Sequence, residues 1–317
     1  MIIANKSVGL KTKQRGPITN IKKYWQLYLF LLIPLIYLLI FKYYPMLGLQ
    51  IAFRKYSIKG GIWNSTWVGF MNFVNFFSSY QFRRILPNTL LLSFYQLIAG
   101  FPIPIILALC FNAIRNRNHK KFFQTITYIP YFISVVVLVG MLFQIFNARI
   151  GLYGKFYTLL NEVSPKDLLS SPAAFRHLYV WSGIWQNSGW GTIIYIAALS
   201  SVDMELHEAA QIDGATRFKR MLYVDLPAII PTISIMLILS SGSIMNIGFE
   251  KVFLLQNNLN LSTSEVISTY VYKVGLAAGG GDFSYATAIG FFNSLVNFIM
   301  IVVVNKISKI VSKSSLW

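Results

Sequence analysis

Six long apolar segments are the feature of this sequence that most constrains its fold. A helix needs roughly 20 apolar residues to span a hydrocarbon core of about 30 Å, because its backbone must satisfy its own hydrogen bonds there. Hydrophobic residues make up 55% of the 317 residues and charged ones 12%, against about 25% charged in soluble domains. We therefore predict an all-α membrane protein with six transmembrane helices, at 24–41, 89–114, 122–146, 178–199, 228–247 and 286–305.

The basic residues between these segments predict the orientation of the chain. Of its 28 lysines and arginines, 16 lie in the segments 1–23, 115–121, 217–220 and 306–313. Cytoplasmic loops are enriched in such residues, whereas long loops such as 42–88 cross the membrane largely regardless of charge. Both termini are therefore predicted to be cytoplasmic. The net charge of +18 follows this topology, and we do not predict nucleic-acid binding.

The chain is predicted to form a single transmembrane domain over 24–310, flanked by a basic cytoplasmic tail at 1–23 and a second tail at 311–317. A cleaved signal peptide would also begin with a basic stretch and an apolar run. However, Tyr43, Tyr44 and Pro45 stand where its small-residue cleavage site would be needed. We interpret 24–41 as a retained first span.

Motifs for catalysis and for nucleotide binding are missing from the sequence. It contains no GxxxxGK[ST] loop, HExxH, CxxC or GxSxG, so we predict no catalytic residue, no metal site and no cofactor in this chain. The interiors of the six segments also carry no Asp, Glu, Lys or Arg, although ion-coupled transporters keep such groups for use. Energy for any active transport is therefore expected from another protein.

The connection 200–227 has the signals of a short exposed helix. Ser201 or Asp203 can cap its start, and Gly214 is placed to end it about ten residues later. The small Ala209 and Ala210 would let another surface approach its backbone closely. A capped helix of this kind could also simply rest on the lipid headgroups.

The spacing within this connection resembles the EAA loop of binding-protein-dependent ABC importer permeases, E-A-A-x3-G-x9-I-x-L-P, with Val224 in place of Ile. The resemblance implies the type I ABC importer permease fold, with 200–227 as the coupling loop. It also implies that a coupling helix over 206–214 docks on an ATPase. The residues implied in ATPase coupling are Leu206, Glu208, Ala209, Ala210, Gly214, Leu226 and Pro227.

Other segments resemble sugar permeases within this family. The segment 67–73 is similar to the outer-loop signature of MalF-like sugar permeases, and 257–276 and 283–290 are similar to LplB-type oligosaccharide permeases. The resemblance implies a multi-pass protein of the bacterial cytoplasmic membrane that moves an oligosaccharide and is not an enzyme. The implied partners are a second permease of the same fold, two subunits that bind ATP and Mg, and an extracellular or periplasmic solute-binding protein.

Polar and aromatic residues inside the spans are candidates for the substrate pathway, because sugars need hydroxyl partners and aromatic faces. Small and polar residues also hold membrane helices together, so helix packing stays an alternative for each of them. A peptide or phosphate permease of the same machinery and a self-contained channel or membrane enzyme are the alternative functions. The candidate residues are Tyr128, Tyr131, Gln144, Trp185, Gln186, Asn187, Ser188, Trp190, Ser240, Ser243 and Asn246.

Overall fold

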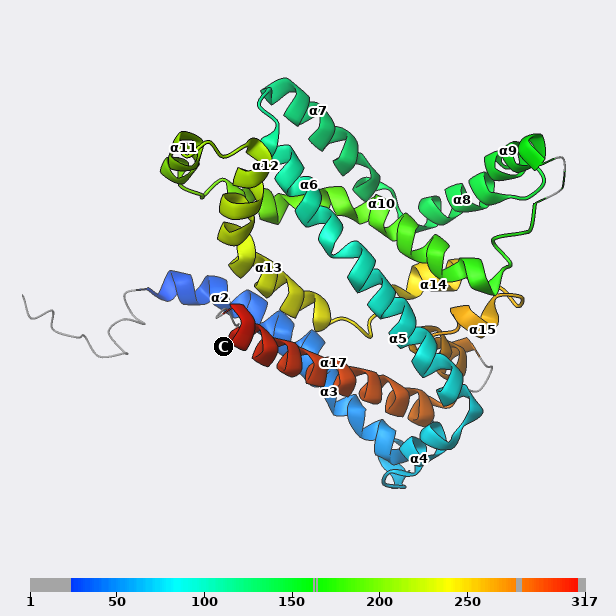
Figure 1. Ribbon diagram of the computed structural model, residues 1–317. Helices are drawn as coiled ribbons and strands as arrows, with labels where there is room; N and C mark the ends of the chain where they lie inside the picture. Colours follow the sequence, from blue (N-terminus) through cyan, green and yellow to red (C-terminus); the bar gives the residue numbers. More distant parts are fainter. Residues whose placement is uncertain (1–23, 162, 164, 278–280, 313–317) are drawn as a thin grey trace, which may run out of the picture. The chain divides into compact units, whose positions relative to one another are not determined.

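The computed structural model describes residues 24–161, 163, 165–277 and 281–312. The predicted tail 1–23 and the end of the tail 311–317 lie outside the described residues. The chain divides into two units, 1–50 and 51–317, and each is described by itself. Figure 1 shows the helices and strands with the labels used below.

The first unit is helical throughout its described part. It contains α2 (Trp25–Leu38), a π-helical turn η1 (Leu39–Tyr43), α3 (Tyr44–Met46) and the start of the 3₁₀ helix η2 (Leu47–Phe53). No residue of α2 is buried, and its apolar side chains are exposed all round. A helix that is apolar on every side suits lipid as its solvent. The helical run Trp25–Phe53 is long and apolar enough to cross a membrane.

The second unit begins with a β-hairpin, which corrects the all-α prediction. Strand β1 (Arg54–Ser57) pairs with β2 (Gly61–Trp67) in antiparallel register, with Arg54 opposite Trp67. Gly61 has a φ of +61°, a conformation that glycine adopts without steric cost. The backbone N–H of Tyr56 donates to Ser284 Oγ at 2.8 Å, which ties the hairpin to the last helix. Helix α4 (Met71–Ser78) follows.

Four long helices form the body of the second unit. A run of 34 residues combines α5 (Tyr80–Gly100) with α6 (Pro102–Ala113), and α10 (Pro172–Leu199) packs along both of them (Figure 1). Helix α13 (Leu226–Ser241) packs against α10 and against α17 (Phe283–Ser312). These helices correspond to four of the six predicted spans, although α5 begins nine residues before 89 and α13 ends at Ser241, before 247.

The predicted third span, 122–146, is wrong as a single helix. It consists of α7 (Arg117–Tyr128), the 3₁₀ turn η3 (Ile129–Phe132) and α8 (Val135–Phe146), with a bend of 99°. Pro130 lacks a backbone N–H and disfavours helix at the residue before it. The hydroxyl of Ser134 then accepts from the N–H of Val137 at 3.3 Å and caps the new helix. Helix α9 (Leu152–Asn161) follows.

The structure does not confirm the predicted number of six crossings. Within the described ranges, four helices are long and apolar enough to cross a membrane, or five if the bent pair α7 and α8 counts as one span. Helix α10 has 28 residues but includes many polar ones. The chain is thus a mostly helical membrane protein. Six crossings and two cytoplasmic termini remain predictions.

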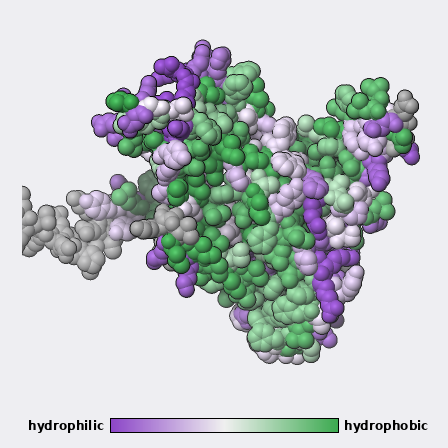
Figure 2. Space-filling model, in the orientation of Figure 1, coloured by the Kyte–Doolittle hydropathy of each residue, from purple (hydrophilic) through white to green (hydrophobic). Residues whose placement is uncertain are grey.

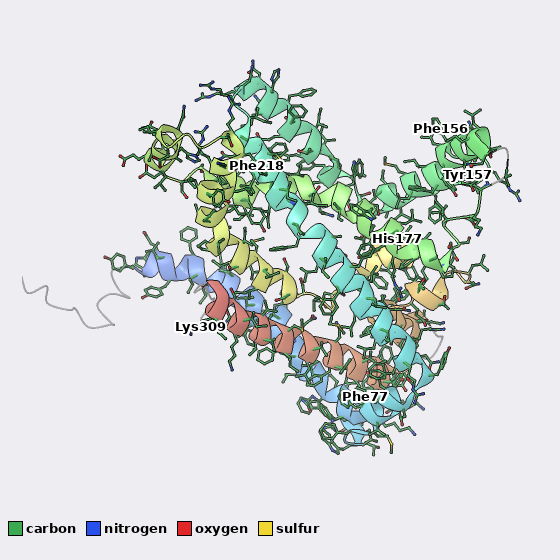
Figure 3. All side chains as sticks on the ribbon, in the orientation of Figure 1. Phe77, Phe156, Tyr157, His177, Phe218 and Lys309 are labelled. Atoms are coloured by element: carbon green, nitrogen blue, oxygen red, sulfur yellow. The ribbon has the colours of Figure 1, made fainter. Side chains whose placement is uncertain are left out.

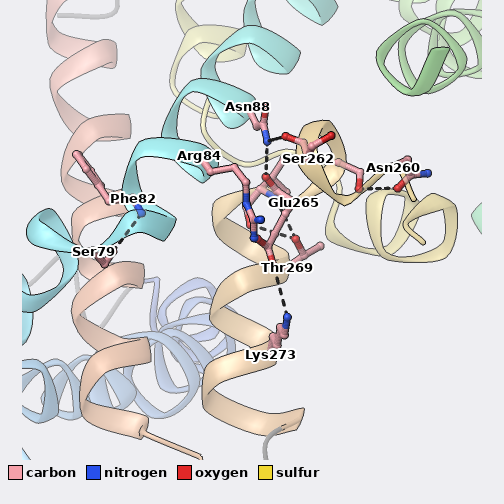
Figure 4. A network of polar contacts seen from close by, with 11 residues as sticks. Ser79, Phe82, Arg84, Asn88, Asn260, Ser262, Glu265, Thr269 and Lys273 are labelled. Atoms are coloured by element: carbon pink, nitrogen blue, oxygen red, sulfur yellow. Dashed lines mark hydrogen bonds and ion pairs between the residues drawn. The ribbon is translucent and has the colours of Figure 1, made fainter. Parts of the chain in front are cut away.

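Short helices connect α13 to α17. They are α14 (Phe249–Leu255), α15 (Leu261–Ser264), α16 (Ile267–Tyr272) and the π turn η5 (Lys273–Ala277). Glu265 lies among them, is only 2% exposed, and forms an ion pair with Arg84 of α5 (Figure 4). The ammonium of Lys273 lies 3.8 Å from the same carboxylate. This polar network joins the segment 257–273 to the start of α5.

Polar residues gather at the opposite end of the second unit as well. Figure 2 shows hydrophobic side chains over much of the visible face of the helices, and hydrophilic ones at the end that holds the loop 203–225 and the start of α7. We call the end that holds this loop the loop end, and the end that holds Glu265 the network end.

Candidate functional site

The predicted exposed helix in the connection 200–227 is present at the loop end as α11 (Met204–Ile212). The carboxylate of Asp203 caps it and accepts from the N–H of Glu205 at 3.0 Å. Such an N-cap stabilises a helix by about 1 kcal/mol. Because this capping is local, the sequence alone was enough to place the helix.

Gly214 ends α11, as the sequence predicts. Its φ of +76° lies in the left-handed region. The N–H of Ala215 donates to Ala210 O at 2.9 Å, and the N–H of Gly214 donates to Gln211 O at 3.1 Å. These two bonds form a Schellman motif, which provides hydrogen-bond donors for two of the last carbonyls of the helix.

Helix α11 is fastened to two long helices through one buried carboxylate. His207 Nε2 lies 3.2 Å from Asp225 Oδ1, and Asn112 Nδ2 donates to the same oxygen at 3.3 Å. Asp225 ends the π turn η4 (Met221–Asp225) directly before α13, and Asn112 is near the end of α6. A displacement of α11 would therefore be transmitted to both α6 and α13.

The other side of α11 faces outward. Met204, Leu206 and Ile212 are exposed by 67%, 55% and 86%. Phe218 on α12 (Arg217–Arg220) is also exposed and lies nearby (Figure 3). Glu208 and Ala209 are exposed, while Ala210 is half-buried. An exposed apolar face fastened from behind is suited to contact with another protein.

The remaining two residues predicted to act in coupling, Leu226 and Pro227, lie in the first turn of α13. Leu226 is half-buried against a cluster that includes Ile229 and Leu199, and Pro227 is exposed. Proline is favoured in the first turn of a helix, because the N–H it lacks would have no partner there. The coupling residues thus lie on one continuous stretch from α11 to α13.

A cavity of about 350 Å³, lined by apolar side chains together with several hydroxyl and amide groups, lies between α5, α6, α10 and α13; we call it the polar cavity. Volumes of this order are usual for small-molecule sites. The cavity brings together five of the predicted pathway residues. They are Asn187, Ser188, Ser240, Ser243 and Asn246.

Two further polar residues of the cavity, Ser93 and Gln96 of α5, are absent from the sequence-based candidates. Ser93 is 6% exposed, and its hydroxyl has no hydrogen-bond partner among the described residues. A buried polar atom without a partner is costly, so Ser93 is a further candidate for contact with a ligand. Two polar residues three positions apart in the apolar run 89–114 were the sequence signal, since they share one helix face.

Four predicted pathway residues, among them Trp190, belong instead to the packing of η3 and its flanking residues against α10. Tyr131 stacks on Trp190 with ring centroids 4.5 Å apart, and Gln186 Nε2 donates to Ile133 O at 2.7 Å. Tyr128 accepts from Thr192 Oγ1 at 3.3 Å. The polar groups of Gln186 and Tyr128 are thus engaged in holding helices together. For these residues the structure supports the packing alternative.

The last two predicted pathway residues also lie away from the polar cavity. Trp185 lines a separate apolar pocket between α8 and α10, together with Trp181 and His177. His177 on α10 (Figure 3) lies within hydrogen-bond distance of Tyr95, whose hydroxyl accepts from Trp181 Nε1 at 2.9 Å. Gln144 is exposed on α8. Trp185 and Gln144 are therefore not brought together with the cavity residues.

An exposed helix fastened to apolar spans, together with a polar cavity between those spans, defines a membrane-embedded permease. The family described as binding-protein-dependent transport system inner membrane component matches residues 100–313. The chain belongs to this family, and it is a permease subunit of an ABC importer in the bacterial cytoplasmic membrane. The resemblance of the EAA loop is thereby confirmed at the level of the family.

Two relatives from Bacillus subtilis (strain 168) are similar over most of their length. Protein LplB is 45% identical over 283 residues, covering 89% of this chain and 88% of the relative. The polygalacturonan/rhamnogalacturonan transport system permease protein YteP is 40% identical over 299 residues, covering 94% and 92%. These similarities confirm the likeness to LplB-type permeases that segments 257–276 and 283–290 indicated.

Solved structures show the same fold. A chain of a bacterial ABC transporter involved in the import of the acidic polysaccharide alginate superposes with a TM-score of 0.85 at 38% identity, covering 93% of this chain and 99% of that one. A chain of the alginate transporter in complex with an alginate pentasaccharide-bound periplasmic protein superposes with a TM-score of 0.86, also at 38% identity. The type I importer fold that the resemblance implied is thus shared with solved permeases.

Proposed function

We propose that this permease moves an oligosaccharide derived from a polysaccharide across the cytoplasmic membrane without altering it chemically. The observation that carries the proposal is the polar cavity among membrane helices, lined by hydroxyl and amide side chains such as Ser93, Gln96 and Asn187. Hydroxyls and amides both donate and accept hydrogen bonds, so they complement sugar hydroxyls. The names of the relatives YteP and the alginate importer support the same class of solute.

Transport in this proposal is driven from the loop end. Helix α11 docks through its exposed face on an ATP-binding subunit, which also holds Mg. Closure of two such subunits pushes α11, and the contacts of Asp225 with His207 and Asn112 carry the movement to α13 and α6. The chain then crosses the membrane six times, with both termini and the loop end in the cytoplasm and the network end outside.

A second permease of the same fold and an external solute-binding protein complete the proposed importer. One solved relative is an alginate transporter in complex with a pentasaccharide-bound periplasmic protein, which supports this composition. The exposed apolar surface of the spans supports it as well, because part of that surface has to be covered by either lipid or a partner helix.

Purification from the native membrane in a mild detergent tests the assembly. We expect a second permease, an ATP-binding subunit and a solute-binding protein to be recovered, and Gly214→Pro to release the ATP-binding subunit while the second permease remains. Gly140→Ala, on α8 and with no other atoms near the new methyl group, is the matched control and retains every subunit. A chain recovered alone that still conducts solute in liposomes would contradict the proposal.

Peptide or phosphate transport is the alternative within the same machinery. The lining of the cavity offers several hydroxyl and amide groups and no charged side chain within the described residues, which suits a solute rich in hydroxyl groups better than phosphate or a peptide. Binding of a peptide or of phosphate, rather than an oligosaccharide, by the cognate solute-binding protein would favour the alternative.

A further inference from the structure

Lys251 on α14 is a buried basic residue that belongs neither to the connection 200–227 nor to the cavity lining. The residue is only 6% exposed, and its neighbours on α14, Val252 and Leu255, belong to an apolar cluster with Tyr179. Its ammonium donates to Tyr179 O at 2.8 Å and lies 4.8 Å from the centre of the Tyr179 ring. An ammonium has three donors, and this geometry engages one of them with a full hydrogen bond.

No carboxylate balances this charge in the part of the chain that the structure describes. The three ion pairs among these residues join Arg84 to Glu265, Lys273 to Glu265 and His207 to Asp225. Lys251 takes part in none of them. A buried ammonium without a counter-ion is costly in a membrane protein, and such residues are kept for binding or transport. The burial lowers the pKa of Lys251 to about 7, since desolvation disfavours the charged form.

Gly183 of α10 separates this ammonium from the polar cavity. A Cβ atom at Gly183 would lie 3.2 Å from Lys251 Nζ, and Gly183 itself lines the cavity. No other described atom from outside α10 lies within 4 Å of that Cβ position, so the ammonium packs directly behind Gly183 in the cavity wall. Gly183 is also the cavity residue of α10 nearest to the start of that helix, so Lys251 lies toward the network end.

We infer that Lys251 binds a carboxylate of the solute beside Gly183, and that the transported oligosaccharide therefore contains acidic sugar residues. This inference rests on the proposed function. The hydroxyl and amide lining holds the sugar hydroxyls, and the single cation supplies the counter-ion that a uronate needs. An arriving carboxylate also restores the charged form of the lysine, because an opposite charge nearby favours it.

The test uses the assembled importer in proteoliposomes with its solute-binding protein. The probes are oligosaccharides of three to five residues from polygalacturonate and from alginate, and their neutral carboxyl-reduced counterparts. We expect the wild type to take up an acidic probe at least tenfold faster than its neutral counterpart. Lys251→Met is expected to lower acidic uptake about tenfold and leave neutral uptake unchanged, and Lys251→Arg to retain most of the acidic uptake.

Two further variants separate a binding role from a structural one. Gly183→Ala keeps the lysine but places a methyl group against its ammonium, so it is expected to lower acidic uptake selectively. Lys155→Met, at an exposed lysine on α9, is the matched control and changes neither uptake. Binding-protein-stimulated ATP hydrolysis and recovery of the complete complex show that each variant is assembled.

Two results would overturn the inference while leaving the proposed function intact. One is equal uptake of acidic and neutral probes by the wild type. The other is an equal loss of both uptakes in Lys251→Met, which would make Lys251 a brace between α14 and α10. Failure of the wild type to take up any oligosaccharide, with peptide or phosphate uptake intact, would overturn the proposed function together with the inference.

Discussion

The two ends of the second unit each bury one carboxylate, but they hold it by different means. At the network end, Glu265 is 2% exposed and is paired with Arg84 and Lys273, while Asn88 donates to the backbone oxygen of Glu265 at 3.2 Å. At the loop end, Asp225 is 6% exposed and is held by a histidine and an amide. Both carboxylates bond to the same α5–α6 run, at points about 40 Å apart by helical rise.

The difference lies in the strength of the bonds and in what they join. An arginine keeps its charge at every relevant pH and forms strong charge-assisted hydrogen bonds. The amide of Asn112 is neutral, and the hydrogen bonds that it and His207 form with Asp225 are weaker. The network end is thus built to hold the short helices α15 and α16 in place. The loop end holds α11 by weaker bonds, which in the proposed importer would let that helix move with its partner.

Arg84→Ala should have the largest effect on stability, because it leaves the buried Glu265 with only the ammonium of Lys273 at 3.8 Å. Breaking a buried pair from one side costs about 3–5 kcal/mol. Chemical unfolding in mixed micelles measures this loss, and Arg83→Ala at the neighbouring exposed arginine is the control. The double variant Arg84→Met with Glu265→Met should be less destabilised than Arg84→Ala. If it is equally unstable, the pair is not what holds this end.

Asp225→Ala should be milder in stability, at about 1–3 kcal/mol for lost hydrogen bonds, but stronger in coupling. Without Asp225, His207 and Asn112 no longer share a partner, so binding-protein-stimulated ATP hydrolysis should fall while unstimulated hydrolysis persists. Glu250→Ala, at an exposed carboxylate on α14, is the control and should change neither rate. Normal stimulation in Asp225→Ala would show that force reaches the spans by another route.

Gly214→Ala should lower the free energy of unfolding by about 1 kcal/mol, because an L-residue is strained at a φ of +76°. The matched variant Gly140→Ala lies within α8, has no neighbouring atom within 4 Å of the new methyl group, and should be neutral or slightly stabilising. Circular dichroism during unfolding compares the two. An equal effect of both substitutions would remove Gly214 as the residue that ends the helix.

Ser93→Ala tests the cavity that lies between the two ends and should have the smallest effect on stability. The hydroxyl has no partner to lose among the described residues, so the change should stay within about 0.5 kcal/mol. Oligosaccharide uptake should fall roughly fivefold, the equivalent of one hydrogen bond of about 1 kcal/mol. Ser241→Ala is the control, because that buried hydroxyl donates to Ile238 O at 2.7 Å and lies outside the cavity lining. Unchanged uptake in Ser93→Ala would argue against solute contact at this hydroxyl.

The loop end could be predicted closely from the sequence, whereas the network end could not. Asp203 and Gly214 act on backbone groups within a few residues of themselves, so their spacing was enough to locate α11. Glu265 and Arg84 are 181 residues apart, and nothing near either residue indicates its partner. The β-hairpin was missed for a related reason, since its strands are short and one of their contacts, to Ser284, is also distant.

The cavity shows the same division at the level of single residues. Asn187 and Ser240 were predicted as pathway candidates because they are polar within apolar segments, and they line the cavity. Gln186, adjacent to Asn187 in sequence, instead faces Ile133 and packs helices. Both residues carry a side-chain amide and lie in the same apolar segment, so the sequence does not distinguish them. Only the rotation of α10 about its own axis, set by packing against α5 and α6, decides which of them reaches the cavity.

The sequence by itself determined that this protein is embedded in lipid and is mostly helical. It also determined the position of α11 and the membership of a family of importer permeases. These properties depend on composition and on interactions between residues that are close in the chain. Only the tertiary structure decided the bend at Pro130, the lining of the cavity and the place of Lys251 behind Gly183. Those features depend on which helix faces pack together, and that choice minimises the free energy of the whole bundle rather than of any one segment.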